Sequence, residues 1–200
     1  MKWTEPESPT GWATKERITR YADDHLAVVT ESVISPAGKK PKSWTTIHRK
    51  QAVVVAAMTR DNCLLLVRQE RIPIREAIWE MPAGQVDEDD PTMEEVEATA
   101  SRELEEETGY GLAGGGKVIN LGDCFSSPGF TDEREHLFLL SPVELKKQEN
   151  QEESIVDCRT FTIDEIREMI ARNEIRDANT LSAFARLVAR GLIQVDRAGK

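Results

Sequence analysis

Two nearly continuous apolar runs constrain the fold of this chain most strongly. They are AVVVAAM, Ala52–Met58, and CLLLVRQ, Cys63–Gln69, and four residues, TRDN, separate them. A strand with one face in water alternates apolar and polar residues, whereas a buried strand does not need to. We therefore expect two buried strands joined by a short turn.

Helices and further strands are expected downstream. Thr162 and Glu165 form a capping-box pattern before an amphipathic helix that carries Ile166 and Met169, and a last helix is expected over about 179–190. Short apolar segments predict further strands at Lys117–Gly122, His136–Leu140 and Ile155–Phe161. Mixed helices and strands predict an α/β sandwich.

The first quarter of the chain is predicted to be an appendage. Residues 1–20 are polar and hold two prolines, so we expect a loosely held arm there. His25–Ile34, the turn SPAG and Ser43–Arg49 then predict a β-hairpin. The predicted domains are therefore 1–50, an N-terminal arm with a small antiparallel β appendage, and 51–200, the main domain.

Composition excludes several classes of partner. The formal net charge of −10 argues against broad binding to nucleic acid or to an anionic membrane. No apolar run approaches the roughly 20 residues that span a bilayer, and MKWTEPESPTGW has no signal-peptide core. The three cysteines are scattered within apolar runs, which predicts reduced, buried thiols and a cytoplasmic protein.

The segment RELEEETGY, Arg102–Tyr110, places four glutamates near the end of a predicted helix. Either Asp90 with Pro91 at N1 or a Thr92/Glu95 capping box would start that helix, and Thr108 would end it. Carboxylates are disfavoured at its C-terminal end by the macrodipole. With about 100° per residue, two of the acids fall within the apolar stripe of the helix and one borders it. These are Glu103, Glu107 and the bordering Glu106, whereas Glu105 points to solvent.

Inward-facing carboxylates need a cation. Burying unpaired charge is costly, and like charges this close raise each other's pKa. A hard divalent cation with oxygen ligands, Mg²⁺ first and Mn²⁺ second, would relieve both effects. The alternative is a solvated acidic helix end with Arg102 pairing locally.

The same residues resemble a known motif. Gly84, Glu94 and RELEEETGY look like the Nudix box, G-x5-E-x7-R-E-U-x-E-E-x-G-U, where U is a bulky apolar residue. Seven residues separate Glu94 from Arg102, as in the motif, but nine rather than five separate Gly84 from Glu94, and Tyr110 takes the last U position. Asp90 lies at the five-residue spacing, so it either rivals Glu94 or caps the helix. The resemblance implies a Nudix α/β/α sandwich with a mixed sheet.

The resemblance also implies a chemistry. Nudix hydrolases cleave a nucleoside diphosphate linked to another group. By this resemblance Glu103, Glu106 and Glu107 would bind Mg²⁺, with the backbone carbonyl near Ala83 as a further ligand. Arg102 would orient the carboxylates, and bound metal would activate the attacking water.

Segments outside the box resemble the ADP-ribose pyrophosphatase branch. VRQERIP followed by WEMPAG resembles the stretch before the box, with Arg71 as a substrate-binding arginine. SWTTIHR resembles the N-terminal hairpin, where Trp44 would stack on adenine and Arg49 would reach phosphate or base. SSPGFTDE, Ser126–Glu133, looks like the proline-bearing loop of that branch.

Each of these assignments has an alternative. Trp44 could be a core residue and Arg71 a surface arginine. Trp79, beside the box, is expected to be a packing residue. In the acid-rich loop QENQEESI the resemblance favours Glu153 over Glu152 as a contact to metal or to the attacking water, and the alternative is a solvated loop. The branch is usually a homodimer whose N-terminal strands reach the partner.

The expected function is Mg²⁺-dependent hydrolysis of ADP-ribose or another ADP-sugar. The alternatives are a pyrophosphatase for GDP-sugars or other nucleotides, and a nucleotide-sugar-binding Nudix domain without turnover. All the box carboxylates are present, which favours an enzyme.

Overall fold

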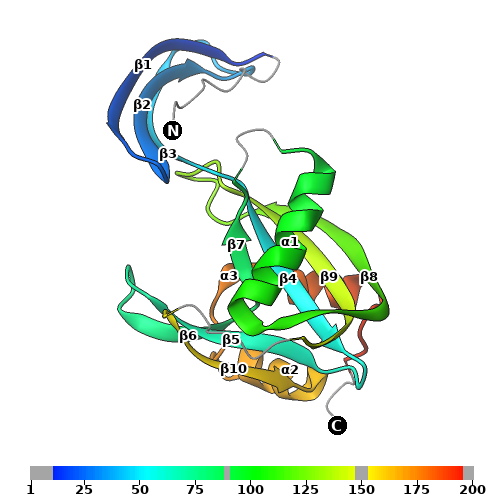
Figure 1. Ribbon diagram of the computed structural model, residues 1–200. Coiled ribbons are helices and arrows are strands. Elements are labelled where there is room, and N and C mark those ends of the chain that lie inside the picture. Colours follow the sequence, from blue (N-terminus) through cyan, green and yellow to red (C-terminus); the bar gives the residue numbers. More distant parts are fainter. Residues whose placement is uncertain (1–10, 88–90, 147–152, 196–200) are drawn as a thin grey trace. The chain divides into compact units, whose positions relative to one another are not determined.

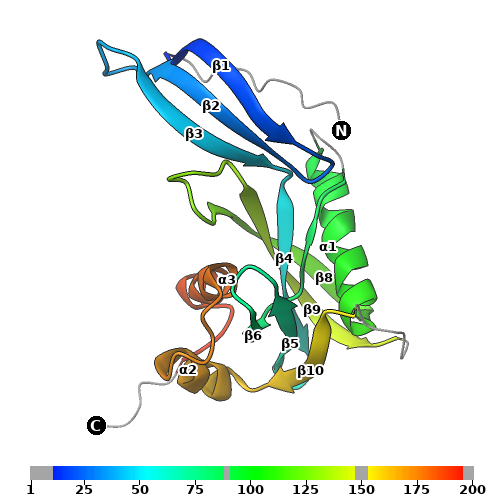
Figure 2. The same ribbon diagram turned by 90° about the vertical axis from the view of Figure 1, so that its left-hand side faces the viewer.

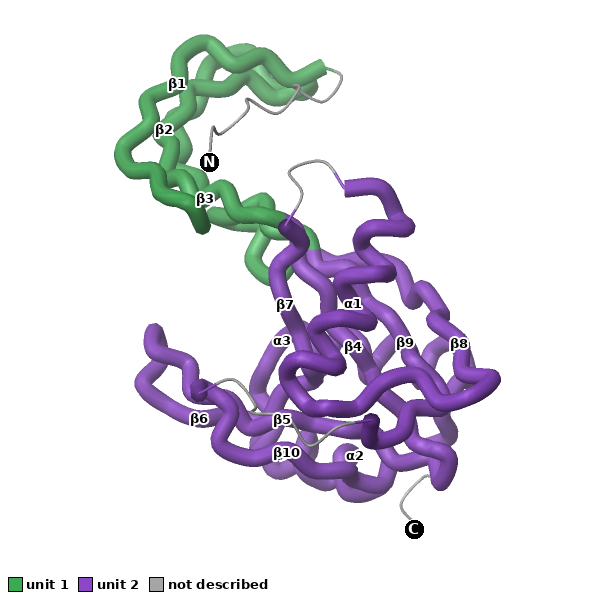
Figure 3. The backbone as a smooth tube through the Cα atoms, in the orientation of Figure 1, with its two compact units in different colours: residues 1–50, 125–134 green, residues 51–124, 135–200 purple. Residues whose placement is uncertain are grey.

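The computed structural model describes residues 11–87, 91–146 and 153–195. The chain divides into two compact units (Figure 3). Unit 1 comprises residues 1–50 and 125–134, and unit 2 comprises residues 51–124 and 135–200. The segment 125–134 therefore belongs with the N-terminal unit, although it is distant from it in sequence.

Unit 2 is built on a seven-stranded mixed sheet (Figure 1). The order along the sheet is β10-β5-β4-β9-β8, with β6 paired to β5 and β7 paired to β4. β4 runs parallel to β9 and antiparallel to β5 and β7. The strands are β4 (Ala52–Thr59), β5 (Leu64–Arg71), β6 (Glu76–Glu80), β7 (Ala83–Gln85), β8 (Tyr110–Phe125), β9 (Arg134–Leu145) and β10 (Ile155–Phe161).

Helices cover both faces of this sheet (Figure 2). α1 (Met93–Thr108) lies on one face, and α2 (Ile163–Ala171) and α3 (Ala178–Ala189) lie on the other. Successive residues of β4 therefore enter different cores, which explains why its sequence has no polar alternation. Val53, Val55 and Ala57 pack with α1, and Val54, Ala56 and Met58 pack with α2 and α3. The α/β/α sandwich is confirmed.

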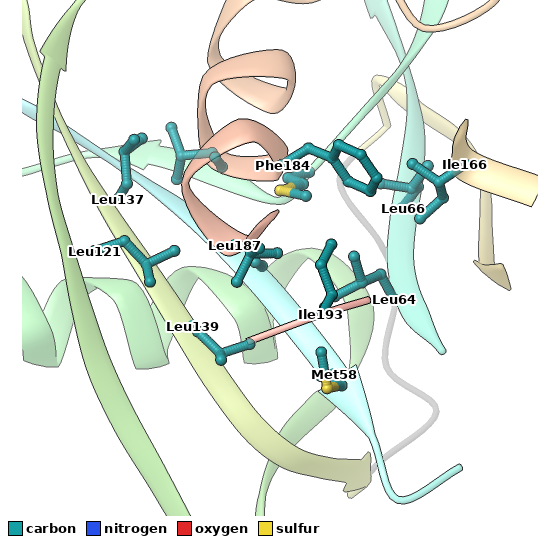
Figure 4. Close-up of a cluster of buried hydrophobic side chains, with 14 of the residues drawn as sticks. Met58, Leu64, Leu66, Leu121, Leu137, Leu139, Ile166, Phe184, Leu187 and Ile193 are labelled. Carbon is teal, nitrogen blue, oxygen red and sulfur yellow. The ribbon is translucent and has the colours of Figure 1, made fainter. Parts of the chain in front are cut away.

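The core beneath α3 shows how this packing is achieved (Figure 4). Phe184 and Leu187 project from the helix toward Leu137 and Leu139 of β9 and Leu66 of β5. All five side chains are buried. None of the helices in the described ranges is long and apolar enough to cross a membrane.

Local signals set the ends of α1. Thr92 caps the helix and forms a capping box with Glu95, which is one of the two predicted starts. Gly109 ends it in a left-handed conformation with φ of 73°, which glycine adopts at little cost. The Thr162/Glu165 capping box before α2 is also confirmed.

β4 changes partners along its length. Ala52–Val54 pairs with β7, whereas Ala57 and Met58 pair with β5. The connection from β6 to β7 therefore passes beside the middle of β4, and the Val55 N–H donates to the Pro82 carbonyl at 2.8 Å. We call residues 80–84 the strap.

Unit 1 contains a three-stranded antiparallel sheet of β1 (Ala13–Ala22), β2 (Leu26–Ile34) and β3 (Lys42–Arg49). The predicted hairpin is confirmed as β2 and β3. The loose arm expected over residues 1–20 is wrong for residues 13–20, which pair with β2 as an edge strand. β1 is exposed along most of its length, so its sequence carries no apolar alternation that would reveal a strand.

Candidate active site

The helix positions of the four box carboxylates are as expected. Glu103 and Glu107 are buried, 9% and 2% exposed, whereas Glu105 and Glu106 are exposed. The inward facing of two acids is therefore confirmed. Glu94 is exposed in the first turn of α1, and its rival Asp90 lies outside the described residues.

A glycine lets β7 approach the first of these acids. A Cβ on Gly84 would lie 2.0 Å from Glu103 Cδ and 2.3 Å from its Oε2. Contacts this short are impossible, so the residue at position 84 must lack a side chain for Glu103 to lie where it does. One residue earlier, the Ala83 N–H donates to Glu107 Oε2 at 3.2 Å. Both buried carboxylates therefore lie against the strap.

Arg102 bonds to its acidic neighbours. Its Nη2 lies 2.9 Å from Glu103 Oε1, and its Nη1 donates to Glu106 Oε2 at 2.8 Å. Asp87 approaches the same guanidinium at 3.4 Å. Local pairing by Arg102 is what the alternative of a solvated acidic helix end predicted. Glu107, however, is buried and so does not fit that alternative.

Each of the residues 80–83 of the strap forms a hydrogen bond with a different element of unit 2. Glu80 bonds to Arg71 of β5, and the Met81 N–H donates to Thr180 Oγ1 of α3 at 2.8 Å. Pro82 is held by β4, as described above, and Ala83 by α1. This part of the backbone is consequently positioned by residues from much of unit 2.

Arg71 forms an ion pair with a buried acid. Its Nε lies 2.9 and 3.1 Å from the two carboxylate oxygens of Glu80, which is 3% exposed, and its Nη2 also contacts Oε2. The hydrogen bonds that Arg71 donates to Glu80 raise the pKa of Arg71 against the effect of burial, and the charges of Glu80, Asp177 and Glu107 add to the increase. Arg71 is therefore half-buried, paired, and within electrostatic reach of Glu107.

Glu153 is exposed in the turn before β10. Its neighbour Ser154 is anchored to the end of β5, where the Glu70 N–H donates to the Ser154 carbonyl at 2.8 Å and Gln69 Nε2 donates to its Oγ at 3.0 Å. The chain at Glu153 thus lies beside the end of β5 that carries Arg71. Glu152 lies outside the described residues.

Trp44 and Arg49 lie in unit 1, next to the segment SSPGFTDE. Trp44 is 57% exposed and its Nε1 donates to the Gly129 carbonyl at 2.8 Å, so the core alternative for this residue is wrong. Arg49 lies 2.9 Å from Glu133, and its backbone N–H donates to Asp132 Oδ1 at 3.2 Å. Asp132 also lies 2.6 Å from Nδ1 of the buried His48.

These contacts border a cavity of about 650 Å³ within unit 1. Its walls include two exposed tryptophans, Trp12 and Trp44, and the ion pair between Arg17 and Glu31. Aromatic faces with a few polar groups are typical of sites for planar ligands. Trp12 was missed in the sequence because the arm around it gave no structural signal.

The residue types around the strap fit a hard cation. Glu103, Glu107 and the backbone at Ala83 offer oxygen ligands of the kind that Mg²⁺ takes. Within residues 11–87, 91–146 and 153–195, no group of three or more His, Cys, Asp or Glu side chains is already gathered as a metal site. The fit therefore rests on donor chemistry and burial, with Arg102 bonding to two of the box acids.

Comparison with known proteins identifies the family. The NUDIX domain model matches residues 48–184. The chain belongs to the Nudix hydrolases. Enzymes of this family generally use divalent metals.

Two relatives and one solved structure show which known proteins this Nudix hydrolase resembles. An ADP-ribose pyrophosphatase of Bacillus subtilis is 32% identical over 92% of this chain and 95% of its own length. A methanol dehydrogenase activator of Bacillus methanolicus is 36% identical over 76% of this chain and 80% of its own. The crystal structure of an ADP compounds hydrolase has a TM-score of 0.73 at 16% identity, covering 94% of this chain and all of that one, and supports the fold.

Besides Trp12, three residues of this Nudix hydrolase were missed by sequence reasoning. Glu80 lies within WEMPAG, a segment quoted for its resemblance without a role for the acid. Asp177 and Thr180 form an N-cap pattern, D-x-x-T, before an apolar helix, which could have been recognised. Trp79, in contrast, packs as expected, edge-on to Phe161 with ring centroids 5.1 Å apart.

Proposed function

We propose that this Nudix hydrolase cleaves the diphosphate of an ADP-sugar, ADP-ribose foremost, to AMP and a sugar phosphate, with Mg²⁺ as its metal. The observation that carries the proposal is the meeting of Glu103 and Glu107 with the strap, in electrostatic reach of Arg71. Carboxylates for a cation and an arginine for phosphate are what diphosphate cleavage needs.

In this proposal the box residues hold the metal. Glu103, Glu106, Glu107 and the Ala83 carbonyl would supply oxygen ligands, and Arg102 would orient Glu103 and Glu106 through its two bonds. When bound there, Mg²⁺ would neutralise charge on the diphosphate and lower the pKa of a water molecule. Water attacks phosphorus, the bond to the bridging oxygen breaks, and each product keeps one phosphate.

Other residues bind and align the substrate. Arg71 is proposed to bind the diphosphate, with its orientation supported by the ion pair to the buried Glu80. Glu153, exposed beside the same end of β5, is proposed to align the attacking water. Trp44 is proposed to stack on adenine, which its exposure and its place in the aromatic cavity support, and Arg49 to reach phosphate or base.

A homodimer is proposed from the surface of unit 1. Among its described residues only Ala27 and Val29 are fully buried hydrophobic residues. The exposed large apolar side chains there are Trp12, Ile18, Tyr21, Trp44, Phe125 and Phe130. Apolar surface of this kind marks an interface, and a second copy of the chain is the occupant we propose. Light scattering should give twice the mass of 22.5 kDa.

The domain division and the location are also proposals. A division into residues 1–50 and 51–200 is supported by the break between compact units after Lys50. A cytoplasmic setting is supported by the three cysteines, which are free. Each is half-buried, so the prediction that the three thiols are buried is wrong.

A substrate panel tests the function. ADP-ribose, another ADP-sugar, a GDP-sugar, a dinucleotide and an oxidised nucleotide are incubated with the protein and Mg²⁺, and phosphate is measured after phosphatase treatment. ADP-ribose should give the highest kcat/KM, and chelation should abolish turnover. A higher value for a GDP-sugar would reject adenine recognition, and binding of ADP-ribose without cleavage would make the domain a sensor.

A further inference from the structure

The first turn of α3 contacts the strap through a buried threonine. Thr180 is 0% exposed, and its Oγ1 lies 2.8 Å from the Met81 nitrogen. Asp177, the N-cap of α3, accepts from both the backbone N–H and the hydroxyl of Thr180, each at 2.7 Å. The cap of one helix is thus joined by hydrogen bonds to a backbone segment far away in sequence.

The direction of these bonds is determined by their chemistry. A hydroxyl carries one hydrogen, and a carboxylate can only accept. The Thr180 hydroxyl must therefore donate to Asp177, which turns its lone pairs toward the Met81 N–H. An ordinary N-cap side chain accepts hydrogen bonds only from its own helix. Here the capping pair of Asp177 and Thr180 also provides an acceptor for the buried Met81 N–H of the strap.

Met81 lies between Glu80 and Ala83, two residues of the strap that contact the site. Glu80 precedes it and bonds to Arg71, and Ala83, two residues later, donates to Glu107. Consecutive Cα atoms are about 3.8 Å apart, so a shift at Met81 is transmitted to both contacts. The Met81 side chain is itself buried in the core beneath α3, which leaves little room for compensation.

We propose that Thr180, oriented by Asp177, is a positioning residue that aligns the strap for cation and diphosphate binding. This inference rests on the proposed function. Thr180 and Asp177 both lie outside the Nudix box, and Mg²⁺ affinity can be measured for their variants without turnover.

Three variants test the proposal. Thr180→Val keeps the shape of the side chain and removes the hydroxyl, whereas Thr180→Ser keeps the hydroxyl. The matched control is Thr99→Val, since Thr99 is also buried and its hydroxyl donates to the Glu95 carbonyl within α1. For each protein we would measure kcat and KM for ADP-ribose, the melting temperature, and Mg²⁺ affinity from the rise in melting temperature on titration.

Thr180→Val should lose about 10- to 100-fold in kcat or in Mg²⁺ affinity, the usual range for residues that orient metal ligands. Thr180→Ser should recover most of the loss, and Thr99→Val should stay within about twofold of the unaltered protein, because its hydroxyl only bonds within a helix. A lower melting temperature in Thr180→Val with unchanged kcat and Mg²⁺ affinity would overturn the proposal.

A second substitution covers the case in which Thr180→Val does not fold. Asp177→Asn keeps a good N-cap but no longer forces the hydroxyl to donate in one direction. It should weaken Mg²⁺ affinity while Thr180→Ser does not, and wild-type affinity in Asp177→Asn would contradict the orienting role. If the unaltered protein cleaves no substrate in the panel, the Mg²⁺ titration still tests the positioning of the strap.

Discussion

The substitution Gly84→Ala should displace the Glu103 carboxylate without unfolding the protein. The added Cβ would lie 2.0 Å from Glu103 Cδ and 2.5 Å from its Cγ. Carbon atoms in contact lie about 3.5–4.0 Å apart, so the carboxylate would have to retreat by about 1.5 Å. The clashing group is the end of a flexible side chain, so it can move without unfolding the protein.

Opposing effects keep the cost in stability small. Forcing a side chain from its rotamer costs about 0.5–1.5 kcal/mol. Replacing glycine by alanine restricts the unfolded chain and contributes about 0.4–1 kcal/mol in the other direction. We expect the free energy of unfolding to change by less than about 1 kcal/mol. In contrast, a misplacement of about 1 Å can cost about 100-fold in rate, or about 2.7 kcal/mol in the activation barrier.

The assay compares kcat for ADP-ribose at saturating Mg²⁺ with urea unfolding of the same samples. Gly114→Ala is the matched control, because no atom lies within 4 Å of a Cβ added there. Gly84→Ala should lose about 100-fold in kcat, because the Glu103 carboxylate is displaced by more than about 1 Å. Gly114→Ala should lose none. If kcat of Gly84→Ala equals that of the control while both remain folded, the approach of Glu103 to the strap has no part in the reaction.

Four further predictions concern single side chains. Glu107→Gln should lower turnover by several orders of magnitude and melt at an equal or higher temperature in chelator, since a metal ligand and a buried charge are lost together; near wild-type activity would remove Glu107 from the metal site. Trp44→Ala should raise KM by the equivalent of about 1–3 kcal/mol with little change in kcat, because stacking acts alike in ground and transition states; an unchanged KM with lower stability would reject the adenine site. Glu153→Gln should lower kcat strongly at unchanged KM while Glu152→Gln does little, as measured by steady-state kinetics at saturating Mg²⁺; equal small effects would indicate a solvated loop. Burial raises the pKa of Cys158 to about 11, so its thiolate forms only at high pH, and alkylation followed by mass spectrometry should be slow at pH 8 and accelerate toward pH 11; rapid labelling of the folded protein at pH 8 would contradict this.

Features that depend on neighbouring residues were predicted well. The ends of α1, the capping boxes at Thr92 and Thr162 and the burial of Glu103 and Glu107 all follow from residues within a few positions of one another. Helical periodicity and capping act over about one turn, so the sequence contains the information in contiguous form. The same holds for the two buried strands β4 and β5, whose apolar runs reflect burial on both faces.

Features that depend on distant partners were not predicted. β1 is an exposed edge strand whose only structural signal is its pairing with β2. The residues 125–134 join the N-terminal sheet through contacts such as Trp44 to Gly129, across 85 positions of sequence. No local preference distinguishes such segments from ordinary polar loops.

The sequence by itself therefore determined the carboxylate helix and the family, because both depend on the spacing of residues that lie close together along the chain. Only the tertiary structure decided what holds the strap against that helix. Arg71, Thr180, Val55 and Glu107 come from four different elements and meet there only after the sheet and its helices have packed. A buried backbone donor such as the Met81 N–H must find an acceptor, but its own sequence neighbourhood does not say which residue will supply it.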